Sequence, residues 1–155
     1  MFWRKFSLPK KYLFLFLLLL VLLAAFLIWR FFVPNKYDYL PVQAGDCIFM
    51  VETALNPAQQ YQGLSHRTSL DADKGMLFLF SPAADKTFVM RKMNFPLDLI
   101  FIRNHRIVNL YHEAAPEGKS PETSYHSGVP VDAVLEIKAG RSRDCHLGVG
   151  SEITW

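Results

Sequence analysis

Three apolar runs between Gly75 and Ile102 restrict the fold of this chain more than any other feature of its sequence. The runs are MLFLF, TFVM and PLDLIFI, and turn-forming residues separate them at Ser81-Pro82 and around Pro96. Short runs rich in phenylalanine and branched residues between such turn formers are typical of strands buried on both faces. The sequence therefore predicts a sheet whose central strands have no side open to solvent.

One carboxylate, Asp98, lies inside the last of these runs. Side chains alternate between the two faces of a strand, so Asp98 shares a face with Ile100 and Ile102. A charge on an apolar face needs a partner or a function. Two interpretations stay open: a structural carboxylate that pairs with Arg67 or Arg91 or accepts backbone N–H groups, and a cleft residue that acts as acid, base or ligand anchor.

The first third of the chain has a different composition. No residue between Tyr12 and Trp29 is charged, and about 18 such residues in one helix can cross a bilayer. More basic residues precede this segment than follow it, which predicts a cytoplasmic N-terminus. We therefore expect residues 1–33 to form a basic tip and a single transmembrane helix in the inner (cytoplasmic) membrane, residues 34–45 a tether, and residues 46–155 one domain facing the periplasm or the cell exterior. A cleaved signal peptide is the alternative, although its apolar region would be shorter.

The formal net charge of +3 comes from this N-terminal segment. Five of the 17 basic residues precede Val33, which leaves 12 to set against all 14 Asp and Glu, so the remainder carries about 12 − 14 = −2. The basic balance therefore reflects the N-terminal segment and not a phosphate-binding surface. Nucleic acid is not an expected partner.

The sequence contains two cysteines, Cys47 near the start of the domain and Cys145 near its end. Outside the cytoplasm, a disulfide between them would be stable. Two unpaired thiols in apolar surroundings are the alternative, and the sequence does not decide between the two.

Capping and turn signals predict one short helix among several short strands. Asn56 is a suitable N-cap, Pro57 fits the first helical position, and Gly63 ends the helix. Asn104-His105 is expected at the tip of a hairpin, and residues 112–130 form a long loop. Strands are expected over residues 47–53, 76–80, 87–90, 96–102, 106–111 and 132–138, with a last short strand near the C-terminus. This pattern predicts a mixed, β-rich (α+β) fold, a small barrel-like domain preceded by the transmembrane helix.

Five motifs occur in a recognisable order, namely Gly63-Leu64-Ser65-His66-Arg67, Gly75-Met76-Leu77-Phe78-Leu79-Phe80, Phe88-Val89-Met90-Arg91, Pro96-Leu97-Asp98-Leu99-Ile100-Phe101 and Val134-Leu135-Glu136. Together they resemble the domain of unknown function 192 family, also called uncharacterised protein family 0127, over about residues 51–153. The resemblance implies a compact, barrel-like fold in a prokaryotic protein that is usually exported or membrane-anchored, and it implies no established reaction. The chain departs from the family pattern at Ser65, Val89 and Lys92-Met93, where methionine, an aromatic residue and Asn-Thr are common.

The candidate ligand-binding residues are Arg67, Met76, Met90, Arg91, Asp98 and Glu136. Guanidinium groups favour bidentate contact with carboxylates or phosphates. The two arginines and two carboxylates could therefore line a polar cleft for an anionic or sugar-like ligand. Structural ion pairs at a strand edge are the alternative, and solvent exposure alone would explain Glu136.

No motif of a metal site, a cofactor loop or a nucleophile elbow is present, and the five histidines are isolated from one another. We therefore expect neither a metal nor a cofactor. The sequence favours a non-enzymatic domain that binds a small ligand, a peptide or an envelope component. The alternatives are an envelope hydrolase or other enzyme with Asp98 as general base, and a structural partner of another membrane protein.

Overall fold

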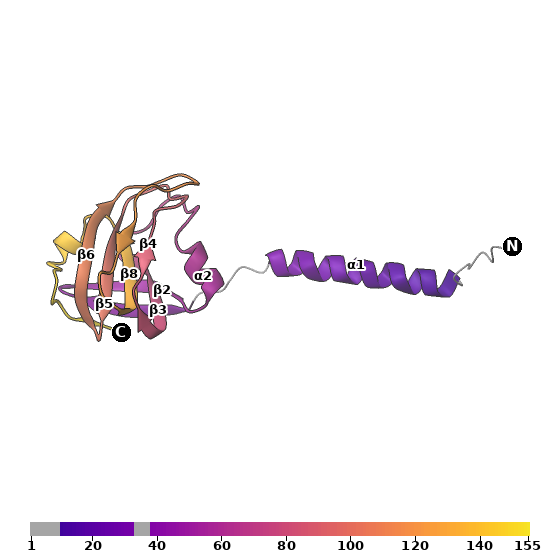
Figure 1. Cartoon of the computed structure of the whole chain (residues 1–155), viewed down its shortest axis with the longest axis horizontal. Helices are drawn as coiled ribbons and strands as arrows, with labels where there is room; N and C mark the ends of the chain where they lie inside the picture. Colours follow the sequence, from indigo (N-terminus) through magenta and orange to yellow (C-terminus); the bar gives the residue numbers. More distant parts are fainter. Residues whose placement is uncertain (1–9, 33–37) are drawn as a thin grey trace. The chain divides into compact units, whose positions relative to one another are not determined.

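The computed structural model describes residues 10–32 and 38–155 of the chain (Figure 1). The chain divides into two compact units, residues 1–36 and Tyr37–Trp155. In the first unit, helix α1 spans Lys10–Phe32. The second unit contains β1 (Tyr39–Ala44), β2 (Cys47–Ala54), α2 (Pro57–Gln62), β3 (Lys74–Ala84), β4 (Thr87–Phe88), β5 (Leu97–Arg103), β6 (Arg106–Ala114), β7 (Tyr125–His126), β8 (Val131–Lys138), α3 (Arg141–Asp144) and β9 (Ile153–Thr154).

The apolar segment that forms α1 is not supported as a membrane span. A helix needs about 20 consecutive, mostly apolar residues to cross the hydrocarbon of a bilayer. Among residues 10–32 and 38–155, no helix meets this requirement of length and apolarity. The prediction of a transmembrane helix is therefore wrong. The predicted basic tip and the beginning of the predicted tether lie outside the described residues.

The second unit is built on one seven-stranded sheet with the order β6-β5-β8-β3-β2-β1-β9. Strands β2 and β3 are parallel, and the other neighbouring pairs are antiparallel. The sheet curls into a half-barrel, as Figure 1 shows. Its outer strands approach each other at one end, where the Ile107 N–H donates to the Ser151 carbonyl (3.0 Å) and the Ile153 N–H donates to the His105 carbonyl (2.9 Å). The predicted β-rich, barrel-like domain is therefore confirmed in its coarse form.

Both faces of the central strands are buried, as the apolar runs predict. Alternate residues of β3, β5 and β8 enter two separate apolar clusters. Leu77, Ile100 and Leu135 belong to the first cluster, whereas Phe78 and Phe101 belong to the second. Because the side chains of a strand alternate in direction, each of these strands contributes to a core on either side of the sheet.

Helix α2 begins and ends where its capping residues predict. The Gln59 N–H donates to Asn56 Oδ1 (2.9 Å), and the Asn56 N–H donates back to Gln59 Oε1 (3.3 Å), which completes a capping box. Pro57 occupies the first turn, and Gly63 ends the helix with a φ of 50°. The predicted hairpin is also present, because Asn104 and His105 both have positive φ values, 50° and 61°, between β5 and β6.

Several segments differ from their predictions. The turn predicted at Ser81-Pro82 lies within β3, and the loop predicted over residues 112–130 contains the end of β6 and all of β7. The predicted tether contains β1, which pairs with β2 along its whole length and buries the alternate residues Val42 and Ala44. The TFVM run forms only the two-residue strand β4, which pairs with β7 in a separate sheet. Helix α3 follows Gly140 and was not predicted, because four residues are too short to carry a helical pattern.

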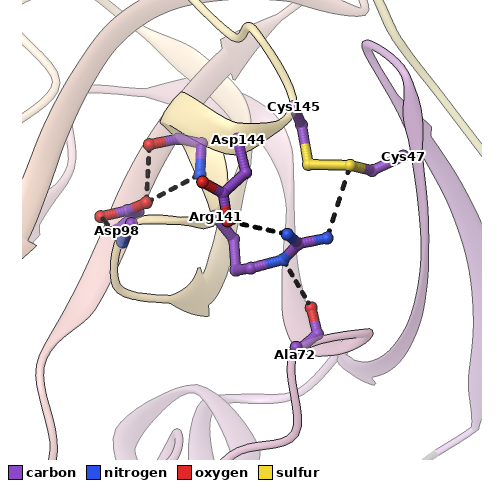
Figure 2. Close-up of polar contacts among 8 residues, drawn as sticks. Cys47, Ala72, Asp98, Arg141, Asp144 and Cys145 are labelled. Atoms are coloured by element: carbon purple, nitrogen blue, oxygen red, sulfur yellow. Dashed lines mark hydrogen bonds and ion pairs between the residues drawn. A yellow bond between two sulfur atoms is a disulfide. The ribbon is translucent and has the colours of Figure 1, made fainter.

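A disulfide connects the first residue of β2, Cys47, to Cys145, which follows α3. Cys47 and Cys145 are 98 residues apart in sequence, with a Cα–Cα distance of 5.6 Å. Arg141 of α3 lies beside it, as Figure 2 shows: its Nη2 lies 3.5 Å from Cys47 Sγ, its Nε donates to the Ala72 carbonyl (3.1 Å), and its Nη1 pairs with Asp144 (2.9 Å). These contacts attach α3 to the turn before β3 as well as to β2.

We predict that replacing Cys47 and Cys145 together by serine lowers the free energy of unfolding by roughly 2–5 kcal/mol, because the disulfide closes a long loop in the unfolded chain. Denaturant unfolding of the full chain measures the change. The wild-type protein kept reduced provides the matched control and should lose a similar amount. An unchanged unfolding midpoint in both samples would contradict the prediction.

Candidate functional site

A cavity of about 440 Å³ lies between α2 and the segment that contains β4. The floor is formed by buried Leu64, Phe78, Met90 and Glu136. Half-buried and exposed side chains form its sides and mouth, among them Gln60, Tyr61, Ser65, Phe80, Lys86, Phe88, Val89, Arg91 and Met93. A concave, mainly apolar site with a few polar groups is the usual form of a small-molecule pocket.

Aromatic contacts hold β4 against the main sheet and so form one wall of the cavity. Phe88 contacts Phe78 edge to face, with ring centroids 5.0 Å apart, and contacts Phe101 at 5.8 Å. Tyr111 and Tyr125 continue the series from Phe101 at 5.9 and 5.2 Å. Edge-to-face pairs at these separations are stabilising beyond the area that they bury. The position of Phe88 therefore depends on the core and not on the two-residue strand pairing alone.

Glu136 lies at the floor within a row of side chains that crosses the sheet. The register pairs Glu52 with Met76, Met76 with Glu136, and Glu136 with Leu99. Residues paired in this way on neighbouring strands share a face of the sheet. Two carboxylates therefore lie on either side of Met76, on the face that carries the second apolar cluster.

The two carboxylates of this row differ in their surroundings. Glu52 accepts a bidentate ion pair from Arg67, with N–O distances of 2.5 and 2.7 Å. Burial raises the pKa of the Glu136 carboxyl to about 8, and the positive charge of Arg67 only partly opposes the shift. At neutral pH the Glu136 side chain is therefore mainly a neutral acid that can donate a hydrogen bond into the cavity.

Arg91 supplies a cation at the side of the cavity. Its guanidinium stacks on the Tyr61 ring at 3.8 Å from the centroid, and its Nη2 donates to the Tyr61 carbonyl (2.9 Å). The Arg91 Nε is buried and has no hydrogen-bond partner within residues 10–32 and 38–155. A buried donor left unpaired is costly, so an acceptor atom on a bound ligand would stabilise this arrangement.

Asp98 is part of a different site, on the opposite face of the sheet, because its register partner is Ile137, the residue after Glu136 on β8. Figure 2 shows Asp98 beside α3. Its side chain is 0% exposed. Its Oδ1 accepts the N–H groups of Glu113 (2.8 Å) and Gly140 (3.2 Å), and its Oδ2 accepts the N–H (2.9 Å) and hydroxyl (2.6 Å) of Ser142. Four hydrogen bonds occupy the acceptor capacity of a carboxylate. Asp98 thus joins α3 and β6 to β5.

A histidine continues this network without forming a nucleophilic triad. His112 Nδ1 lies 2.8 Å from Ser142 Oγ. In a serine triad the histidine lies between the serine and the acid, whereas here the serine lies between Asp98 and His112. Ser142 is also fully buried, and its hydroxyl proton is directed at Asp98. The arrangement supports structure and not acyl transfer.

The structure separates the six candidate ligand-binding residues. Met90, Arg91 and Glu136 line the cavity, whereas Met76 is buried core and Arg67 is paired with Glu52 beside it. Asp98 lies on the other face. No group of three or more His, Cys, Asp or Glu that could hold a metal occurs in the part of the chain that the structure describes.

Sequence reasoning missed most of the apolar lining of the cavity. Tyr61, Phe80 and Phe88 stand on three different elements, α2, β3 and β4. Their apolar character fits core positions equally well, so no local pattern marks them. The only partial indication of the cavity is Tyr61, a large aromatic residue that is exposed at the end of the capped helix α2.

Comparison with known proteins places this fold among uncharacterised relatives. A family model described as Uncharacterized ACR, the DUF192 family, matches residues 41–155, which confirms the resemblance carried by the five motifs. A protein of unknown function from Novosphingobium aromaticivorans DSM 12444 is 32% identical, with 79% of this chain and 89% of that chain covered and a TM-score of 0.73. A protein from Sinorhizobium meliloti 1021, named as a candidate transcription regulator, is 30% identical, with 77% and 95% covered and a TM-score of 0.71. No curated protein matches the chain.

We predict that Asp98→Asn lowers the free energy of unfolding by roughly 2–4 kcal/mol, because the amide turns its own donors toward N–H groups that now lack an acceptor. Ser142→Ala removes one of the four bonds and should cost about 1–2 kcal/mol. Denaturant unfolding measures both changes, with the exposed Asp71→Asn as the matched control. Equal stability of D98N and D71N would refute the structural role.

We predict that Glu136 makes stability fall as the pH rises. The pKa of this carboxyl is 4.5 in the unfolded chain and about 8 in the folded protein, so the folded state binds more protons between these values. The stabilising contribution is complete below about pH 4.5 and is lost as the pH rises through about 8, with a total on the order of a few kcal/mol.

Glu136→Gln keeps the size of the side chain and removes the titration. Unfolding in denaturant at several pH values between 5 and 8 should therefore show a smaller decline for this variant than for the wild type. The exposed Glu122→Gln variant is the control and should follow the wild type. Parallel curves for E136Q and the wild type would exclude the raised pKa.

Proposed function

The chain belongs to the DUF192 family, whose description gives no activity, and we propose from the geometry of the cavity that the domain binds a small amphipathic ligand. The observation that carries the proposal is the aromatic cavity of about 440 Å³ with the buried acid Glu136 at its floor. A cavity of this size encloses a small organic molecule. The proposal replaces the expected polar cleft by a mainly apolar one.

The polar groups of the cavity define the ligand further. At neutral pH, protonated Glu136 offers a donor at the floor, and Arg91 Nε offers a second buried donor at the side. Lys86 adds another positive charge and lies 4.0 Å from the Phe80 ring centroid. These groups favour a ligand with an apolar or aromatic body, an anionic group near Arg91 and Lys86, and an uncharged acceptor near Glu136.

Binding is better supported than catalysis. The enzyme hypothesis rests on Asp98 as a general base, but that carboxylate is fully buried and accepts four hydrogen bonds away from the cavity. A general base must lie within hydrogen-bond reach of the proton that it removes. Asp98 therefore fits a structural role.

We further propose that the domain works in an oxidising compartment such as the periplasm or the cell exterior. The Cys47–Cys145 disulfide supports this location, because disulfides persist in such compartments and are rare in the cytosol. Mass analysis under non-reducing conditions of the protein from its source cells tests it: a disulfide is expected, and two free thiols would count against the location.

We predict that the full chain binds 8-anilinonaphthalene-1-sulfonate, a fluorescent aromatic anion, at one saturable site. Val89 lines the mouth of the cavity and is 42% exposed, so Val89→Glu adds a negative charge there without disturbing the core. Like-charge repulsion should weaken binding by about fivefold or more. Fluorescence titration measures the change.

The chain offers a matched control in Val129, which is 41% exposed and is not part of the lining. Val129→Glu should bind the probe as the wild type does. Native mass spectrometry of protein from its source cells adds an independent test, because a retained small molecule is expected. Equal affinities of V89E and V129E, or no saturable binding, would overturn the proposed function.

A further inference from the structure

A second cavity, of about 410 Å³, lies where the β5–β6 turn, β8 and the last residue of the chain meet. Leu55, Leu79 and Phe80 provide its apolar lining, and His105, Asp132 and Trp155 provide its polar and aromatic groups. Among the described residues that line it, Asp132 has the only charged side chain when His105 is neutral. The cavity is thus lined by aromatic rings and by the negatively charged side chain of Asp132.

Asp132 has one satisfied and one unsatisfied oxygen. Its Oδ2 accepts the N–H of Asn104 at the hairpin tip (2.9 Å). Its Oδ1 is buried and accepts no hydrogen bond from the described residues. A buried acceptor without a donor is unfavourable, and such groups are rare in folded proteins. A donor supplied by a ligand would complete the site.

His105 and Trp155 add an aromatic surface and a second acceptor. Their rings lie 4.3 Å apart at an interplanar angle of 38°. His105 Nδ1 lies 3.1 Å from the Ile153 carbonyl, which can only accept, so Nδ1 carries the proton and Nε2 of the neutral ring is an acceptor. Indole rings are the strongest aromatic partners of organic cations.

We propose that this cavity is a second ligand site, which binds an organic cation bearing N–H donors, such as a guanidinium or primary ammonium group. One N–H fills the empty position at Asp132 Oδ1, and the charge lies against the Trp155 ring. A metal ion is a poorer occupant, because no group of three or more ligating side chains occurs in the described part of the chain. An anion would meet the charge of Asp132.

The test uses methylguanidinium as the probe and follows the amide signals of the full chain by NMR. Saturable shifts are expected at Asn104 and at the Trp155 indole N–H in the millimolar range. The neutral analogue methylurea, with similar shape, should bind at least about tenfold more weakly. No saturable shift, or equal binding of methylurea, would overturn the proposal.

Two variants locate the interaction. Asp132→Asn keeps an oxygen for the Asn104 N–H and should weaken binding at least about tenfold, whereas the exposed Asp85→Asn control should not. Trp155→Leu keeps Asp132 and should weaken binding several-fold, which preserves the test if D132N fails to fold. Unchanged affinity in both site variants would refute the site.

The guanidinium group can come from a free compound or from an arginine side chain, and N-acetyl-arginine amide separates the two sources. Tighter binding than that of methylguanidinium indicates an arginyl peptide as the ligand, and weaker binding indicates a free guanidino compound. Either result supports a cation site and assigns its source.

Discussion

Burial of both faces of β3, β5 and β8 is the constraint on which the rest of the structure depends. A charged side chain on such a strand cannot reach water, so it must be fully hydrogen-bonded or give up its charge. Asp98 and Glu136 show the two outcomes. Four donors from Glu113, Gly140 and Ser142 surround Asp98, whereas burial raises the pKa of Glu136 to about 8. The same constraint therefore produces a structural anchor on one face and a neutral acid on the other.

The sheet has a cavity on the Glu136 face because only short elements, helix α2 and the small β4–β7 sheet with its neighbouring segment, cover it. Helix α2 stands at one side, and β4 with the following segment stands at the other. Phe88 fixes that segment through its edge-to-face contacts with Phe78 and Phe101. The covering elements meet the core at their apolar residues and leave a hollow between them, into which Arg91 and Glu136 project polar groups. The cavity, and with it the proposed binding site, follows from incomplete covering of a buried face.

Local signals predicted the parts of the fold that depend on nearby residues. The capping box of α2 and the positive φ values at Asn104 and His105 are decided within a few residues, so the sequence was sufficient there. Strand β1 was missed because Tyr39 and Pro41 resemble linker residues, and its pairing with β2 is visible only in three dimensions. The state of Glu136 was missed for a similar reason. Period-2 alternation placed it opposite Leu135 correctly, but both faces of β8 are buried, so that placement did not expose it.

The two proposed ligand sites share an apolar lining and differ in a few charged side chains. Phe80 lines both of them. In the cavity beside α2, Arg91 and Lys86 lie near Glu136, which burial keeps mainly neutral, so the electrostatic field favours an anion. In the second cavity, Asp132 has the charged side chain, and Trp155 and His105 lie beside it, so the electrostatic field favours a cation. Both cavities have an apolar lining, which by itself favours neither an anion nor a cation. Because these charges lie on side chains at the edges of the apolar lining, substitutions there would change the kind of ligand that the proposed sites favour without any change in the sheet that supports them.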